Sequence, residues 1–110
     1  MSLRLLESAL ARLEAGRTVA LVTVIEVHGS APRETGARLL LAQDGKVEGT
    51  IGGGPLEARA LEMAHRLFEG GDPVVQLELG LDDTRAADGG MVCGGRVRLL
   101  LERWTPIPPA

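Results

Sequence analysis

The chain contains one phenylalanine, one tryptophan and no tyrosine, so aromatic residues make up only 2% of its 110 residues. A protein this poor in aromatic side chains lacks the stacking surfaces on which single-stranded nucleic acids are commonly bound. The net charge of −3, with no basic run, also argues against a nucleic-acid partner. The core is therefore expected to be aliphatic, built from leucine, valine, isoleucine and alanine.

Cysteine is equally scarce, since Cys93 is the only one. A single thiol cannot form an internal disulfide, which suits a reducing compartment, and the cytoplasm is the expected location. No apolar run reaches the length of a membrane span, and the first residues show no signal-peptide pattern. The length is sufficient for one domain with a modest core.

The apolar pattern predicts two main helices and about five strands. The expected helices cover about residues 2–15 and 55–69, and the expected strands cover about 19–27, 37–42, 47–51, 75–79 and 97–104. Residues 19–27 are almost continuously apolar, which is typical of a strand buried on both faces in the middle of a sheet. We therefore expect an α/β (α+β-like) fold with a mixed sheet, forming a single domain over residues 1–104 and ending in a proline-rich tail at 105–110.

Leucines are spaced regularly in the first expected helix. Leu3, Leu6, Leu10 and Leu13 recur every three or four residues and so share one face of the helix. We expect this face to pack against the sheet.

A glycine turn stands between the third expected strand and the second helix. Gly52, Gly53 and Gly54 lack a Cβ atom, so the backbone there can adopt positive φ angles and approach a ligand closely. Pro55 suits a first helical position, and with Gly54 as N-cap the carboxylate of Glu57 can bond back to the cap N–H. The N–H groups at this helix start favour an anion such as phosphate. The alternative is a tight turn that binds no ligand.

Two further loops carry candidate chemistry. Arg33 can clamp a phosphate or carboxylate, Ser30 can donate a hydrogen bond to the same anion, and Cys93 lies beside Gly94 and Gly95. Neighbouring glycines expose the sulfur and free backbone N–H groups around it. The alternatives are a solvated loop arginine and a small buried cysteine at a strand start. All three glycine-containing loops are expected at strand ends, where they can converge on one small-molecule site.

The order of these motifs is specific. Gly29–Arg33, Gly36-Ala37, Gly49–Glu57 and Cys93–Gly95 together resemble the N-terminal domain of the XdhC/CoxI family, over about residues 19–102. Members of this family are accessory proteins of molybdenum hydroxylases such as xanthine dehydrogenase and carbon monoxide dehydrogenase.

The resemblance implies that the chain binds the molybdenum cofactor (molybdopterin), protects it during sulfuration and delivers it to the hydroxylase apoenzyme. It implies a maturation chaperone rather than an enzyme, with the hydroxylase, a sulfurase and a second copy of the chain as partners. Full-length members also carry a C-terminal Rossmann-like domain, which these 110 residues do not include. The dinucleotide binding of that domain is therefore not carried over to these residues.

The resemblance also suggests roles for individual residues. The turn from Gly52 to Glu57 would hold the phosphate of the cofactor, Arg33 would pair with it, and Cys93 would lie near the metal or its sulfur. Many relatives carry a cysteine at the position of Gly54, and several of the xanthine dehydrogenase type carry one at the position of Val92. Here Cys93 is the only thiol, so a two-thiol site would need the Cys93 residues of two copies.

Two other functions stay open at this point. The first is an interaction module that docks on the hydroxylase or on a Rossmann-domain partner without binding cofactor, for which the acidic stretch Asp82–Asp88 would be suitable. The second is a small enzyme with Cys93 as nucleophile, which is disfavoured because no general base is evident.

Overall fold

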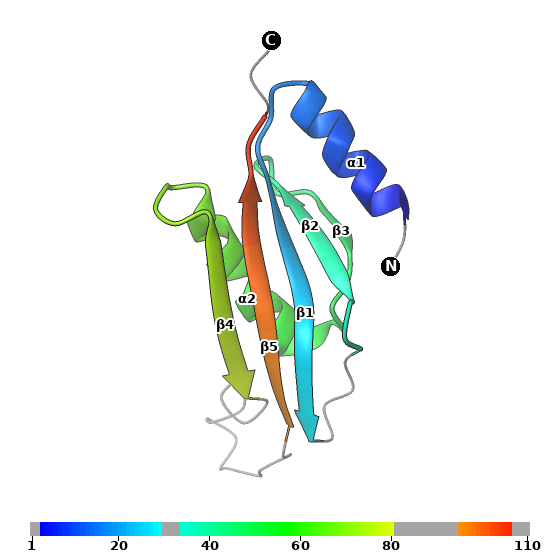
Figure 1. The fold of residues 1–110 in the computed structure, drawn as a ribbon, viewed down its shortest axis with the longest axis vertical. Coiled ribbons are helices and arrows are strands. Elements are labelled where there is room, and N and C mark those ends of the chain that lie inside the picture. The colour runs from blue at the N-terminus through cyan, green and yellow to red at the C-terminus, as the bar shows by residue number, and fades with distance from the viewer. Residues whose placement is uncertain (1–2, 30–33, 81–94, 107–110) are drawn as a thin grey trace.

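The computed structural model describes residues 3–29, 34–80 and 95–106, which form two helices and a five-stranded sheet (Figure 1). In chain order the elements are α1 (Leu3–Glu14), β1 (Val19–Gly29), β2 (Arg38–Ala42), β3 (Val47–Gly49), α2 (Gly54–Leu67), β4 (Val74–Gly80) and β5 (Gly95–Trp104). The predicted two helices and five strands in one compact unit are confirmed.

The strand order in the sheet is β3-β2-β1-β5-β4. The long apolar strand β1 is central, as predicted, and every residue from Val19 to Val24 is buried. The expectation of a mixed sheet is wrong, because all four strand pairings are antiparallel. The reason is that β5 enters the sheet between β1 and β4 and runs opposite to both of them.

The pairing of β1 with β5 spans the whole length of both strands. It extends from Val19 opposite Trp104 to Gly29 opposite Gly95, with one irregularity between Val24 and Glu26. Gly29 and Gly95 therefore lie side by side at one end of the sheet, although the sequence separates them widely.

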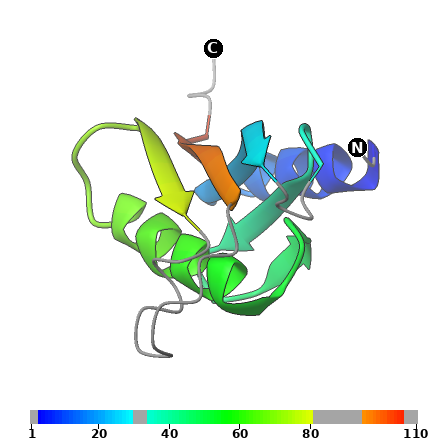
Figure 2. The same cartoon turned by 90° about the horizontal axis from the view of Figure 1, so that it is seen from below.

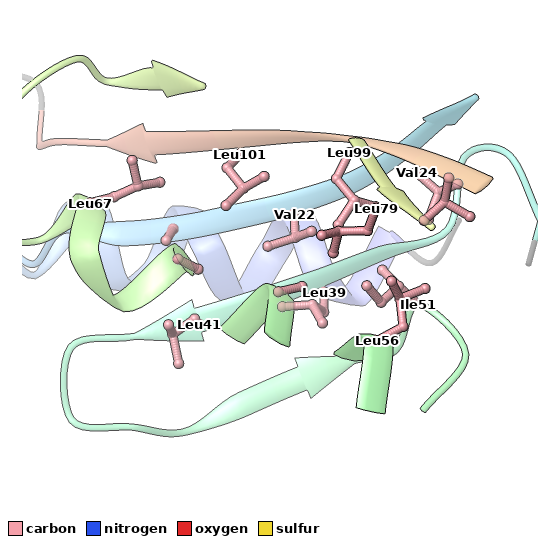
Figure 3. Packing of buried hydrophobic residues seen from close by; sticks show 14 residues of the cluster. Val22, Val24, Leu39, Leu41, Ile51, Leu56, Leu67, Leu79, Leu99 and Leu101 are labelled. Atoms are coloured by element: carbon pink, nitrogen blue, oxygen red, sulfur yellow. The ribbon is translucent and has the colours of Figure 1, made fainter. Parts of the chain in front are cut away.

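The main core lies between α2 and one face of the sheet (Figure 3). Alternate residues of β1 and β5 point towards this helix, among them Val22, Leu99 and Leu101, and none of these side chains is more than 1% exposed. From α2 the buried residues are Leu56, Ala60, Ala64 and Leu67. The core of the described residues is aliphatic, as the composition predicted.

Helix α1 packs on the opposite face of the sheet, against β1 and β2 (Figure 2). The predicted stripe of leucines is right only in part: Leu13 packs against the sheet, but Leu3 is 71% exposed and Leu10 is 56% exposed. The buried residues of the helix are Leu5 and Ala9. They are four residues apart and belong to a neighbouring stripe, so the helix is rotated from the orientation that the leucine spacing suggested.

β2 and β3 form a hairpin, and its turn contains Asp44 and Gly45, a pair that favours such turns. The side-chain oxygen Oδ1 of Asp44 accepts a hydrogen bond of 3.0 Å from the backbone N–H of Lys46. This bond is the main reason why the pKa of Asp44 lies below its usual value, and the nearby charges of Arg12, Lys46 and Arg17 add to the effect.

Candidate functional site

The predicted glycine turn leads from β3 into α2. Gly52, Gly53 and Gly54 have φ angles of 120°, 77° and 71°, a conformation that residues with a side chain rarely adopt. The N-cap is Gly53 rather than the predicted Gly54, so the helix starts one residue earlier and Pro55 lies in its first turn. Hydrogen bonding explains the shift, because Glu57 binds the N–H of Gly53.

The carboxylate of Glu57 organises this turn. Its Oε1 atom accepts hydrogen bonds from the hydroxyl of Thr50 at 2.5 Å and from the N–H groups of Ile51 and Gly53, both at 3.0 Å. The N–H of Gly52 donates to the Thr50 hydroxyl at 3.0 Å. Glu57 therefore has the capping role that the sequence suggested. A phosphate bound through the N–H groups of Ile51 and Gly53 would have to take them from this carboxylate.

Two buried side chains attach the glycine turn to the main core. Ile51 precedes the glycines and Leu56 follows them, and each is only 1% exposed. Both belong to the main core, together with Val24 and Leu79 (Figure 3). Because the turn is attached to the core on both sides, its backbone is held in place, and its glycines add no side chains to its surface. An added Cβ at Gly53 or Gly54 would meet no atom within 4 Å.

The end of β3 and the start of β5 lie at different positions along the central strand β1. β3 ends at Gly49, which lies opposite Leu39, and Leu39 lies opposite Val22 of β1. Gly95 lies opposite Gly29, at the tip of β1. The glycine turn and Gly95 thus belong to the same end of the sheet, with Gly95 further out along it.

Four of the predicted site residues, Ser30, Arg33, Cys93 and Gly94, lie outside the described residues. In the sequence, Ser30 directly follows Gly29 and Gly94 directly precedes Gly95, and Gly29 and Gly95 lie opposite each other in the pairing of β1 with β5. The acidic stretch Asp82–Asp88 also lies outside the described part of the chain. The roles suggested for all these residues remain predictions.

An ion-pair network, which the sequence analysis missed, crosses β1, β5 and β4. Arg98 lies 3.3 Å from carboxylate oxygens of both Glu26 and Glu78, and Arg96 lies 3.3 Å from Glu78. His28 contacts Glu26 at 2.5 Å. The hydrogen bond from Arg98 is the main cause that lowers the pKa of Glu78, and Arg96 adds to it. The sequence signal that could have revealed this network is the placement of charged residues at alternate positions of the strands.

Metal-binding geometry is absent from the described residues. Within residues 3–29, 34–80 and 95–106, no three histidine, cysteine, aspartate or glutamate side chains are grouped so as to hold an ion. The predicted metal contact of Cys93 is outside these ranges. In the same part of the chain, neither helix has the length and apolar character needed to cross a membrane.

A groove of about 570 Å³ lies between α2 and β4, and the sequence analysis did not anticipate it. It begins at Pro55, next to the glycine turn, and is lined by residues of the first half of the helix and the last residues of the strand. These are Pro55, Ala58, Arg59, Glu62, Leu77, Glu78 and Leu79.

Known proteins share both the sequence pattern and the fold. The chain is 30% identical over 106 residues to the molybdenum cofactor insertion chaperone PaoD of Escherichia coli (strain K12), an alignment that covers 96% of this chain and 32% of PaoD. A crystal structure described as a xanthine dehydrogenase from Bacillus halodurans superposes with a TM-score of 0.68 at 25% identity. That match covers 88% of this chain and 29% of the other.

The chain therefore spans about a third of the length of these relatives. A family model matches residues 12–79, which is more than half of the chain and includes the glycine turn. On this evidence the chain belongs to the XdhC and CoxI family.

Proposed function

We propose that this chain is an accessory chaperone that binds the molybdenum cofactor and assists its sulfuration and insertion into a hydroxylase of the xanthine dehydrogenase or carbon monoxide dehydrogenase type. One observation carries the proposal: the similarity to a molybdenum cofactor insertion chaperone extends over 96% of the chain. The hydroxylase apoenzyme and a sulfurase are the proposed partners, and the chain acts as a homodimer or beside a separately encoded partner.

The described residues fit such a cofactor on the outer side of the glycine turn. An added Cβ at Gly53 or Gly54 would meet no atom within 4 Å, so a flat ring or a phosphate would lie against this glycine backbone while Glu57 keeps its own hydrogen bonds. Ser30 and Arg33 would bind the phosphate, and Cys93, with Gly94 and Gly95, would lie at the metal or its sulfur. The cofactor would supply the dithiolene-bound metal, and the chain would hold and shield it.

Titration of the purified chain with molybdopterin tests this proposal, with pterin fluorescence as the readout. Gly53→Val, Arg33→Ala and Cys93→Ala are each expected to weaken binding by roughly tenfold or more, since each removes a contact to a charged or closely packed group. Gly71→Val is the matched control for Gly53→Val, because Gly71 also has a positive φ angle and open space around it but lies at the other end of α2. Unchanged binding in all three variants would contradict the proposal.

A second candidate function is an interaction module that docks on the hydroxylase or on a Rossmann-domain protein and binds no cofactor. The hydrogen bonds of Glu57 favour it, since this carboxylate already binds the N–H groups of Ile51 and Gly53 that a phosphate would need. Molybdenum analysis of chain purified from a molybdenum-replete host separates the two functions. Bound metal and pterin are expected for the chaperone and are not expected for the docking module.

A further inference from the structure

Helix α2 covers its face of the sheet unevenly. It packs mainly on β1, β5 and β2, so the side of the helix towards β4 is less closely covered. The groove of about 570 Å³ described above lies on this side, between α2 and β4. Small-molecule sites in proteins have volumes of about 300–1,000 Å³. The groove is therefore large enough for a ligand with a fused two-ring system.

The groove has an apolar floor. Leu79 is a buried member of the main core, and Leu77 is half-buried and packs against that core. Pro55 and Ala58 add apolar surface from the helix. A flat ring that lies on these side chains removes its own apolar faces from water, which is the main source of affinity in sites of this kind.

Two charged side chains complete the helix wall of the groove. Arg59 and Glu62 are exposed, and neither side chain has a hydrogen-bond or ion-pair partner among the described residues. Glu78 also lines the groove, but its carboxylate is already paired with Arg96 and Arg98. Arg59 and Glu62 are thus the charged groups of this groove that a ligand can engage.

These groups follow one face of α2 in a fixed order. Pro55, Arg59 and Glu62 are separated by four and then three residues, so they lie above one another along the helix. With a rise of about 1.5 Å per residue, Glu62 lies about 10 Å along the helix from Pro55, which adjoins the glycine turn. A ligand that extends from the glycine turn into the groove therefore meets first an arginine and then a carboxylate.

A pterin ring with a phosphate arm matches this order of groups. Its pyrimidinone edge carries a ring N–H and an amino group side by side, and the two can donate parallel hydrogen bonds to one carboxylate, as a guanidinium does. The planar guanidinium of an arginine stacks on the face of such a ring. The phosphate arm leaves from the opposite end of the ring system, which would place it towards the glycine turn.

We propose that the groove between α2 and β4 is the pterin subsite of this chain. Glu62 would accept the two hydrogen bonds of the pyrimidinone edge, Arg59 would stack on the ring, and Leu77 and Leu79 would form the surface beneath it. This inference rests on the proposed function, because it assigns a place to the ring of the cofactor whose phosphate is proposed at the glycine turn. It is carried by described residues alone and does not depend on Cys93.

The first experiment uses two metal-free probes that differ at one position of the ring. 6-Hydroxymethylpterin carries the amino group, and 6-hydroxymethyllumazine carries an oxygen in its place. Fluorescence titration of the full chain is expected to show at least ~tenfold tighter binding of the pterin, since the lumazine lacks one donor and opposes an oxygen to the carboxylate. Amide NMR shifts on pterin binding are expected at Arg59, Glu62 and Leu79.

The second experiment separates the two charged side chains. Glu62→Gln is expected to remove the preference for the pterin, because an amide offers one donor and one acceptor where the ring edge needs two acceptors. Arg59→Ala is expected to weaken both probes equally, roughly fivefold, because stacking does not depend on the amino group. Glu69→Gln and Arg66→Ala change the same residue types outside the groove and are expected to have no effect. All four side chains are exposed, so each variant is expected to fold as the wild type does.

A wild type without a preference for the pterin, or a preference that persists in Glu62→Gln, would overturn the inference. Displacement of the pterin by GMP at equal concentration would overturn it as well, since GMP presents the same edge on a guanine base. Molybdopterin titration distinguishes these results from a failure of the proposed function. Unchanged molybdopterin affinity in Glu62→Gln and Arg59→Ala would overturn the pterin subsite alone. Pterin binding in the groove by a chain that does not bind molybdopterin would contradict the proposed function alone.

Discussion

At the glycine turn, one carboxylate oxygen of Glu57 accepts hydrogen bonds from a hydroxyl and from two backbone N–H groups. A carboxylate binds such donors more strongly than a neutral acceptor does. The turn therefore has an internal anion at the place where the sequence suggested an external one. A ligand of this turn is expected to approach the bare outer side of Gly53 and Gly54 rather than the donors that Glu57 holds.

Removal of this carboxylate is expected to destabilise the fold. Glu57→Ala leaves the N–H groups of Ile51 and Gly53 without their acceptor, and we expect a loss of about 2 kcal/mol in the free energy of unfolding. Glu57→Gln keeps one oxygen acceptor and is expected to lose about half as much. Urea unfolding measures both values, with Glu7→Ala as an exposed control on α1. An Ala variant as stable as the wild type would show that Glu57 does not hold the turn.

Two glycines with similar backbone angles are expected to respond differently to substitution. Gly49 and Gly53 have φ angles of 79° and 77°, but a Cβ at Gly49 would lie 2.5 Å from the carbonyl oxygen of Arg38 and 2.7 Å from Leu5. Gly53→Ala is expected to cost about 1 kcal/mol for the backbone alone. Gly49→Ala adds a clash with the backbone of β2 and is expected to cost roughly 2 kcal/mol more. Equal losses in thermal unfolding would contradict this difference.

At the scale of elements, β5 connects most parts of the structure. Its residues Val97, Leu99 and Leu101 face α2, and Arg98 pairs with β1 and β4 on the other face. The guanidinium of Arg103 donates to the carbonyls of Leu67 at 2.8 Å and Gly71 at 3.1 Å, so it caps the end of α2. One strand thus supplies core contacts, ion pairs and a helix cap.

The ion pairs of β5 with β4 predict a pH dependence. The pKa of Glu78 is lowered from 4.5, chiefly by the hydrogen bond from Arg98. A lowered pKa in the folded state means that the stabilisation is present above about pH 4.5 and is lost as the pH falls through the lower folded value. Carboxyl NMR is expected to show the Glu78 midpoint below 4.5 in the wild type and closer to 4.5 in Arg98→Met. An identical midpoint in both proteins would exclude Arg98 as the main cause.

Most single elements could be predicted from the sequence, because each has a local signal. The apolar run placed β1 correctly, and the local signals of the other strands are the alternation of apolar residues in β4 and β5 and the Asp-Gly pair between β2 and β3. The position of β5 between β1 and β4 has no such signal, since its pairing depends on residues far apart in the chain. The rotation of α1 was missed because leucine spacing alone does not show which face of the helix contacts the sheet.

The candidate site could be predicted only in part, for the same physical reason. The capping role of Glu57 follows from local spacing, and the structure shows it. The groove beside β4 and the network around Arg98 are built from residues of two or three elements, so they appear only when the strand order is known. The neighbourhood of Gly29 and Gly95 likewise depends on the long register between β1 and β5.

For the whole molecule, the two faces of the sheet are stabilised unequally. The α2 face carries a large buried cluster that draws on both helix and strands, whereas α1 contributes the buried Leu5 and Ala9 and the partly buried Leu13 to a small cluster with Val19, Leu21 and Leu40. The outer leucines of α1, Leu3 and Leu10, stay largely exposed. Buried apolar area is the main favourable term in folding, so α1 is held by far less of it than α2 is.

This inequality predicts that α1 opens without the rest of the molecule. Amide hydrogen exchange is expected to show α1 opening with a free energy at least about 2 kcal/mol below that of β1 and β5, whose amides exchange only on global unfolding. Ala9→Gly is expected to widen this gap, because it weakens the helix and its contact with the sheet. Ala60→Gly in α2 is the matched control, since it removes the same methyl group from the main core and is expected to lower the protection of all elements together. If the amides of α1 showed the same opening free energy as those of β1, the two faces would form one cooperative unit.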